Sequence, residues 1–262
     1  MALPISQLRG PTLALFTDLD GTLTTNGRVE ASTYAALERL GAAGVPVVIV
    51  TGRPSGWGQA IMTMVAVAAV VSENGGVTYV RRAGKLDKYY GLPAASVPEW
   101  RRKMHAATVD VVAEVPGAKL STDSRYREVD LAIDWNEEVS LSEESADHAV
   151  EALRARGFTA VKSSVHVNFG PPGFDKLSAC KTVVERVLGG SPDDLSPYVF
   201  VGDALNDAPM FRGFPRSVGV ANVRDWWEAL SDHPKFITEA REGAGLREVV
   251  DQILGSDAEG RA

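Results

Sequence analysis

Short, uninterrupted apolar segments alternate with helical segments in the first part of the chain. The apolar segments are residues 13–17, 45–50 and 68–72, and apolar residues follow helical spacing over residues 31–43 and 59–65. Strands that are apolar on both sides are typical of parallel sheets covered by helices on both faces. This feature restricts the chain to α/β architectures, and we predict a doubly wound, Rossmann-like parallel sheet.

The last third of the chain repeats this alternation. Helical spacing over residues 177–188 precedes an apolar segment at 198–201, and another apolar segment follows at 217–220. The return of the same pattern indicates that both ends of the chain build one sheet. We therefore predict a single core domain made from residues 1–80 and 173–262.

The segment between these two ends has a different pattern. Val129, Leu131, Ile133 and Trp135 alternate with polar or small residues, which indicates a sheet with one solvent-exposed face. Two stretches of helical spacing flank this strand, so the order of elements is β-α-β-β-α-β, the split βαβ pattern. We predict an inserted α/β domain over residues 81–172, with strands at 77–82, 119–122, 129–135 and 161–169 and helices at 97–115 and 142–156.

Composition excludes some classes of function. The 262 residues include 27 basic and 34 acidic side chains, and the net charge of −7 opposes general binding to nucleic acid. The single cysteine, Cys180, excludes an internal disulfide, fits a reducing compartment and is expected to pack in a helix. The most apolar stretch, residues 60–71, is too short to span a bilayer, and residues 1–10 lack the pattern of a signal peptide. We expect a cytoplasmic protein.

Residues 16–22, Phe-Thr-Asp-Leu-Asp-Gly-Thr, end the first predicted strand with two acids. Asp18 and Asp20 are two residues apart and so point to the same side, and Gly21 permits a sharp turn after them. Two carboxylates this close are costly unless a cation joins them or one of them holds a proton. The pair suits a magnesium-assisted nucleophile beside a general acid, and the alternative is a simple acidic turn.

Three further motifs stand at comparable positions. Thr51-Gly52-Arg53 follows the second strand and offers a hydroxyl and a backbone N–H to a phosphate oxygen, unless it is only a strand-to-helix turn. Lys176 begins a predicted helix, where a bound anion would explain a lysine and a solvated surface position is the alternative. The motif Gly202-Asp203-Ala-Leu-Asn206-Asp207 ends a buried strand with acids that could hold Mg²⁺ or cap a helix.

All four motifs fall at the predicted carboxyl end of a strand or at the start of a helix. Ligands of doubly wound sheets bind outside the carboxyl ends of the strands. This coincidence favours one site for phosphate and metal over four unrelated turns.

The chain resembles the haloacid dehalogenase superfamily of phosphatases in four ordered motifs, which are Asp18-Leu-Asp20-Gly21-Thr22, Thr51-Gly52-Arg53, Lys176 and Gly202-Asp203-x-x-Asn206-Asp207. The α/β insert and the motif Glu73-Asn74-Gly75 resemble subclass IIB, whose members carry a large α/β cap and include sugar-phosphate phosphatases. The resemblance covers nearly the whole chain. Leu177 departs from it, because relatives often carry glycine after the lysine.

The resemblance implies a mechanism through an aspartyl-phosphate. It implies Asp18 as the nucleophile and Asp20 as the group that protonates the leaving alcohol and then deprotonates the attacking water. The groups that would hold the phosphoryl oxygens are Thr51, Gly52 and Lys176. The metal would be Mg²⁺, held by Asp18, Asp20 through its backbone carbonyl, Asp203 and Asp207, with Asn206 supporting it from further out.

Specificity is expected to come from the insert, because the core would recognise only phosphate and metal. His166 and Asn168 alternate with Val165 and Val167, so they share one face of a strand that leads to Lys176. The side chains that we consider as substrate contacts are Arg53, Arg125, Arg127, Asp130, Asp134, His166 and Asn168. A satisfied surface histidine and a solvated acidic face stay open as alternatives at this point.

We therefore predict a magnesium-dependent phosphatase that acts on a small phosphorylated metabolite, with a sugar phosphate as the leading candidate. A phosphomutase is the alternative within the same fold, and a metabolite-binding protein without activity is a third hypothesis. No nucleic acid or membrane partner is expected, and a monomer and a homodimer both stay open.

Overall fold

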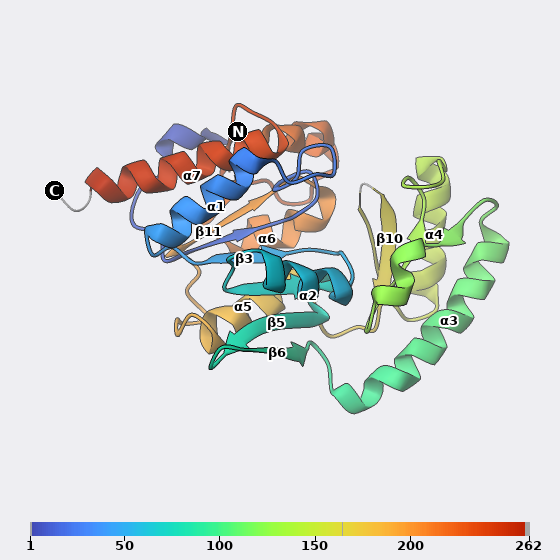
Figure 1. The fold of residues 1–262 in the computed structure, drawn as a ribbon. Helices are drawn as coiled ribbons and strands as arrows, with labels where there is room; N and C mark the ends of the chain where they lie inside the picture. The colour runs from blue at the N-terminus through green and yellow to red at the C-terminus, as the bar shows by residue number, and fades with distance from the viewer. Residues whose placement is uncertain (1, 164, 260–262) are drawn as a thin grey trace.

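The computed structural model describes residues 2–163 and 165–259, and it shows two units that face each other (Figure 1). One unit is built around a nine-stranded sheet and the other around a four-stranded sheet. Among the described residues, no helix is both long enough and apolar enough to cross a membrane.

The nine-stranded sheet has the order β1-β13-β12-β11-β2-β3-β4-β5-β6. Neighbouring strands from β1 to β4 are parallel, whereas β5 and β6 pair in the antiparallel sense. The parallel part confirms the predicted doubly wound sheet. Its strands are β1 Leu3–Pro4, β2 Ala14–Thr17, β3 Val47–Val50, β4 Ala69–Ser72, β5 Val77–Arg82, β6 Lys85–Tyr90, β11 Tyr198–Gly202, β12 Arg216–Gly219 and β13 Phe236–Ile237.

Helices cover both faces of this sheet. Successive strand residues pack on opposite faces, so that Leu15 belongs to one apolar cluster and Phe16 to the other. This is why the central strands β2, β3, β4 and β11 are buried at every position and are mostly apolar. Figure 1 shows α1 and α7 on one side of the sheet and α5 on the other. The helices are α1 Ala31–Ala42, α2 Ser55–Met64 and α7 Glu242–Glu259 on the first face, and α5 Lys176–Arg186 and α6 Ala208–Gly213 on the second.

One prediction about the middle of the chain was wrong, because residues 77–82 are not the first strand of the insert. They form β5, which pairs with β4 in the core sheet, and residues 85–90 form β6 beside it. The sequence of β6, Lys-Leu-Asp-Lys-Tyr-Tyr, reads as a polar linker because β6 is the edge of the sheet. Charged side chains are typical of edge strands, where they prevent pairing with other chains.

The insert consists of a four-stranded antiparallel sheet with the order β7-β8-β10-β9 and two helices. The helices lie on the face that points away from the core, and β10 lies on the core side (Figure 1). The predicted single strand at 161–169 is instead a hairpin of two strands, and residue 164 lies outside the described residues. The elements are α3 Val97–Glu114, β7 Lys119–Leu120, β8 Leu131–Asp134, α4 Glu143–Ala155, β9 Thr159–Lys162 and β10 His166–Gly170.

The boundaries of the insert at residues 81 and 172 stay a prediction. Because β6 ends at Tyr90 within the core sheet, we propose that the insert begins after Tyr90. The return to the core falls between Gly170, the last residue of β10, and Lys176, the first residue of α5. Short 3-10 helices complete the chain, namely η1 Ile5–Gln7, η2 Glu73–Gly75, η3 Ala94–Ser96, η4 Thr122–Tyr126, η5 Leu205–Asp207 and η6 Ala221–Ala229.

Candidate active site

Asp18 and Asp20 follow β2 but take different partners. The backbone N–H of Asp18 donates to the carbonyl of Val201 in β11, and its buried carboxylate lies 2.8 Å from the Lys176 Nζ. The side chain of Asp20 is 30% exposed and lies 2.8 Å from Arg53. The two acids therefore differ in burial and charge environment, as a nucleophile and a proton-transfer group require.

Three buried carboxylates converge at this end of the sheet. Asp18, Asp203 and Asp207 each offer an oxygen, and these oxygens all lie within 4.8 Å of one another. The Lys176 Nζ lies between two of them, 2.8 Å from the Asp18 Oδ1 and 2.7 Å from the Asp207 Oδ1. The loop of residues 203–207, after β11, is stabilised by a hydrogen bond in which the Asp207 Oδ2 accepts the backbone N–H of Asp203 at 3.1 Å.

The electrostatics of this group leave room for a further cation. Burial and the neighbouring carboxylate of Asp207 outweigh the attraction of Lys176 and raise the pKa of Asp18 to about 7. Burial and the charge of Asp18 also raise the pKa of Asp203 well above its ordinary value. One ammonium does not balance three carboxylates, and hard divalent cations prefer carboxylate oxygens. The donor set therefore fits a metal such as Mg²⁺.

Thr22 and Asn222 orient the carboxylate of Asp203. The hydroxyl of Thr22 donates to the Asp203 Oδ1 at 3.1 Å, and the Asn222 Nδ2 donates to the Asp203 Oδ2 at 2.7 Å. Asn222 also donates to the carbonyl of Gly21 at 3.0 Å, so it joins two of the predicted motifs. The sequence analysis missed Asn222, although its place just after the apolar segment at 217–220 was a usable signal.

The loop Thr51-Gly52-Arg53 follows β3 and is held by its neighbours. The buried hydroxyl of Thr51 accepts the backbone N–H of Arg53 at 3.0 Å, and the carbonyl of Thr51 accepts the N–H of Asn74 at 3.1 Å. A Cβ on Gly52 would come within 3.1 Å of the Asn74 side chain and 3.4 Å of the Asn168 amide. Glycine at this position therefore lets the backbone lie close to the cavity that Asp18, Gly52 and Asn168 line.

Arg53 joins the core to the insert. Its guanidinium donates to both oxygens of Asp20 and, at 3.0 Å, to Glu137 of the insert. It also lies 4.8 Å from the centre of the Trp57 ring. Burial would lower the pKa of Arg53, but the hydrogen bonds and charge of Asp20 outweigh burial and raise it.

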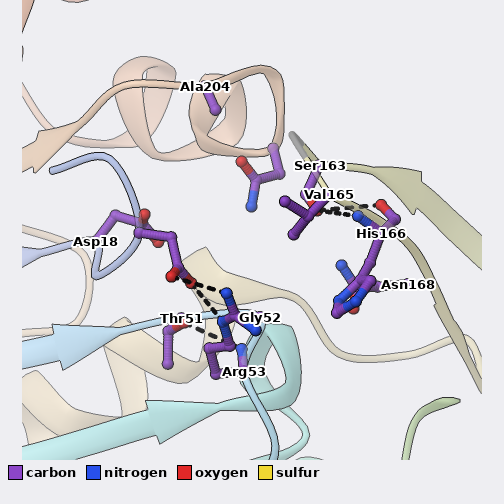
Figure 2. Close-up of a pocket in the computed structure, with 11 residues that line it drawn as sticks. Asp18, Thr51, Gly52, Arg53, Ser163, Val165, His166, Asn168 and Ala204 are labelled. Carbon is purple, nitrogen blue, oxygen red and sulfur yellow. Dashed lines mark hydrogen bonds and ion pairs between the residues drawn. The ribbon is translucent and has the colours of Figure 1, made fainter. Parts of the chain in front are cut away.

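His166 and Asn168 face the core across the cavity, opposite Asp18 and Arg53 (Figure 2). The His166 Nε2 lies 2.8 Å from the Glu137 Oε2, although the alignment is not that of a hydrogen bond. Burial and the charge of Arg127 lower the pKa of His166, which favours a neutral ring. The residues that line the cavity are Asp18, Asp20, Thr51, Gly52, Arg53, Ser163, Val165, His166, Asn168, Ala204 and Asn206.

The other candidate residues of the insert lie elsewhere. Arg127 is buried and donates to Asp123, to Asp130 and, at 3.0 Å, to the carbonyl of Gly52. Asp134 is buried and accepts the backbone N–H groups of Glu137 and Glu138, so neither Asp130 nor Asp134 belongs to a solvated face. Arg125 is exposed, with its guanidinium over the ring of Tyr126, and does not line the cavity.

Comparisons with known proteins show what the chain is similar to. A family model for haloacid dehalogenase-like hydrolases matches residues 15–114. The chain is 27% identical over 244 residues to a phosphoglycolate phosphatase from Methanothermobacter thermautotrophicus, with 92% of this chain and 99% of the relative covered. A Thermoplasma acidophilum crystal structure aligns with a TM-score of 0.73 at 19% identity and covers 94% of this chain and 99% of that one.

A second solved structure carries ligands. The sucrose-phosphatase of a Synechocystis species, in complex with sucrose and phosphate, aligns with a TM-score of 0.65 at 15% identity. The alignment covers 93% of this chain and 98% of the sucrose-phosphatase. At such identities the two structures show a shared fold.

Proposed function

We propose that the chain is a phosphatase of the haloacid dehalogenase-like hydrolases, whose family model matches residues 15–114, and that Asp18 is its nucleophile. The observation that carries the proposal is the position of Asp18, buried at the carboxyl end of β2 and 2.8 Å from Lys176. Asp20 stands beside it with a separate partner, Arg53. The two acids can therefore perform different steps of phosphoester hydrolysis.

In the first step, an oxygen of Asp18 attacks phosphorus and the bond between phosphorus and the leaving oxygen breaks. Asp20 gives its proton to the leaving alcohol, and Asp18 then carries the phosphoryl group as an aspartyl-phosphate. In the second step, Asp20 takes a proton from water, whose oxygen attacks phosphorus. The bond between phosphorus and the Asp18 oxygen breaks, which releases inorganic phosphate and restores the Asp18 carboxylate. The hydroxyl of Thr51, the backbone N–H of Gly52 and the ammonium of Lys176 would stabilise the phosphoryl oxygens.

We propose Mg²⁺ as the cofactor, held by Asp18, Asp203 and Asp207. The side chain of Asp20 is paired with Arg53, which leaves the backbone carbonyl of Asp20 as its donor to the metal. When bound, Mg²⁺ supplies positive charge that offsets the crowded carboxylates and the phosphoryl oxygens. Thr22 and Asn222 keep the Asp203 carboxylate oriented for this task.

The substrate that we propose is a small sugar phosphate or a related metabolite. Arg53, a cation that lines the cavity, is already paired with Asp20 and Glu137. The opposite wall offers the neutral polar side chains of His166 and Asn168, which suit hydroxyl groups. Phosphoglycolate is a second candidate, because a relative aligned over 92% of this chain is a phosphoglycolate phosphatase.

A reducing compartment such as the cytoplasm is part of the proposal. Cys180 lies buried in α5 as a free thiol, so the prediction that it packs in a helix is confirmed. The single cysteine supports the proposal of a reducing compartment. We propose no nucleic acid partner, because the net charge is −7. A monomer and a homodimer are both compatible with the proposed chemistry.

The test is release of inorganic phosphate from a panel of sugar phosphates, 2-phosphoglycolate and p-nitrophenyl phosphate, with Mg²⁺ or with a chelator. Asp18→Asn serves as the blank, because it keeps the shape of the side chain and removes the nucleophile. Metal-dependent release above the blank supports the proposal, and the best substrate identifies the class. Isomerised sugar phosphate in place of inorganic phosphate would indicate a mutase, and no release from any compound would refute the proposal.

A further inference from the structure

The carboxylate of Glu73 connects the insert to the core. Glu73 follows β4, is fully buried and accepts four backbone hydrogen bonds. One oxygen accepts the N–H groups of Ser55 and Glu128, both at 2.8 Å. The other accepts those of Val129 and Asp130, at 2.7 and 3.0 Å. Ser55 begins α2 of the core, whereas the other three residues lead into β8 of the insert.

The backbone at Glu73 also holds the loop that follows β3. The N–H of Glu73 donates to the carbonyl of Arg53 at 3.0 Å, and the N–H of Asn74 donates to the carbonyl of Thr51 at 3.1 Å. Both Glu73 and Asn74 have φ of 52°, the left-handed region that non-glycine residues rarely adopt. Such a conformation persists only where the surrounding structure enforces it. The turn at Glu73 and Asn74 is therefore held by two segments. The loop after β3 accepts its backbone N–H groups, and the insert donates backbone N–H groups to the Glu73 carboxylate.

The position of β8 determines where the insert presents its cavity residues. β8 pairs with β10, so that Asp134 lies opposite His166 and Ala132 lies opposite Asn168. Asp134 also accepts the N–H of Glu137, whose carboxylate reaches Arg53. A shift of β8 would consequently move the cavity wall formed by the insert relative to Asp18.

We propose that Glu73 is a positioning residue, which fixes the wall of the cavity formed by the insert against the phosphate-binding loop and so sets discrimination among leaving groups. Glu73 does not line the cavity beside Asp18, and it borders a neighbouring pocket that Asn168 and Lys176 also line. Because its carboxylate is fully buried and each oxygen accepts two backbone N–H groups, it acts through the segments that it holds. This inference rests on the proposed phosphatase function. It assigns the choice of substrate partly to a buried core residue outside the insert.

Glu73→Gln tests this directly, because each oxygen of Glu73 accepts two N–H groups. In either orientation of the amide, its NH₂ group faces two donors and both bonds are lost. We expect the ratio of kcat/KM between the best sugar phosphate of the panel and p-nitrophenyl phosphate to fall about ten-fold, which corresponds to about 1.4 kcal/mol. The fall should come mainly from a higher KM for the sugar phosphate, in a variant that is folded at the assay temperature.

Glu128→Gln is the matched control, with the same change one residue before Val129. The partners of the Glu128 carboxylate are the Lys88 Nζ, which donates to both oxygens, and the hydroxyls of Ser55, Tyr79 and Tyr90. In Glu128→Gln the amide NH₂ loses its bond from Lys88 in either orientation, but the four backbone hydrogen bonds to the Glu73 carboxylate stay in place. In Glu128→Gln, the ratio of kcat/KM between the sugar phosphate and p-nitrophenyl phosphate should stay within two-fold of the ratio in the unmodified protein. An unchanged ratio in folded Glu73→Gln would overturn the inference.

Amide hydrogen exchange in the unmodified protein tests whether Glu73 holds the insert, even if Glu73→Gln does not fold. The amides of Glu128, Val129 and Asp130 precede β8, and we expect them to exchange as slowly as those of β8. Exchange as fast as that of Gly84, in the exposed turn between β5 and β6, would overturn the inference. An unmodified protein without any turnover would refute the proposed function, whereas normal turnover with fast exchange would refute only the role of Glu73.

Discussion

Both carboxylate oxygens of Asp20 are held by the guanidinium of Arg53, with the Nε 2.8 Å from the Oδ2 and the Nη2 3.1 Å from the Oδ1. A two-point contact of this kind depends on the planar fork of arginine. The same guanidinium reaches Glu137 of the insert at 3.0 Å. The orientation of the proposed acid and base is therefore set by the core and the insert together.

Arg53→Lys should impair the proton-transfer steps more than the attack by Asp18. An ammonium cannot hold both oxygens of Asp20, so the carboxyl group loses its orientation. We expect kcat/KM for a sugar phosphate to fall about 10²-fold. The loss for p-nitrophenyl phosphate should be smaller, because p-nitrophenolate leaves without a proton.

The control for this variant is Arg39→Lys, on the surface of α1. Arg39 pairs with Asp251 at 2.8 Å, and both side chains are more than half exposed. Such a pair contributes little, so neither substrate should be affected. The attack by water is common to both substrates, so the comparison is made with kcat/KM, which reports the first step. An equal loss of kcat/KM for both substrates in Arg53→Lys would contradict the role of Asp20 as the acid.

Lys176→Met should abolish turnover and destabilise the fold. The ammonium of Lys176 is paired with Asp18 and Asp207 in a fully buried position, so its removal leaves buried carboxylates uncompensated. Loss of one partner of a buried ion pair costs about 3–5 kcal/mol. Urea unfolding in the presence of a chelator measures this loss. Lys85→Met, at an exposed position of β6, should change stability by less than about 0.5 kcal/mol.

Asn222→Ala should weaken the response to Mg²⁺ while leaving the chemical step available. Asn222 holds the Asp203 Oδ2 at 2.7 Å, and removal of a partner that orients a metal ligand costs about 10–100-fold in metal affinity. The Mg²⁺ concentration for half-maximal turnover should rise by that factor, with kcat largely restored at saturating Mg²⁺. Ser32→Ala, exposed on α1, is the control. An unchanged Mg²⁺ response would exclude Asp203 as a ligand that depends on Asn222.

The motifs of the core could be found from the sequence because their positions follow from the sheet. Asp18, Thr51 and Asp203 each follow an apolar strand, and parallel strands bring their carboxyl ends to one edge. Lys176 lies far along the chain, yet its place at the start of a helix pointed to the same edge. The structure places the Lys176 Nζ between two of the predicted acids.

The roles of the polar residues in the insert could not be predicted from the sequence, because these residues make structural contacts that depend on the tertiary fold. The alternation at 129–135 predicted a strand with a wet face, but Asp134 is buried and binds backbone N–H groups of the following turn. Arg127 is occupied by two acids and the carbonyl of Gly52. Only His166 and Asn168, among the candidates considered on the insert, line the cavity beside Asp18.

Glu128 should make stability depend on acid pH. Burial would raise its pKa, but hydrogen bonds from Lys88, Ser55 and Tyr90 outweigh burial and lower the pKa from 4.5 to about 2. The unfolded chain takes up this proton near pH 4.5 and the native state only near pH 2, so the contribution of Glu128 is complete above this range and is lost as pH falls through it. The difference in unfolding free energy between the unmodified protein and Glu128→Gln should therefore shrink between pH 6 and pH 3 in urea titrations. A difference that stays constant with pH would show that the Glu128 carboxylate is not stabilised by its partners.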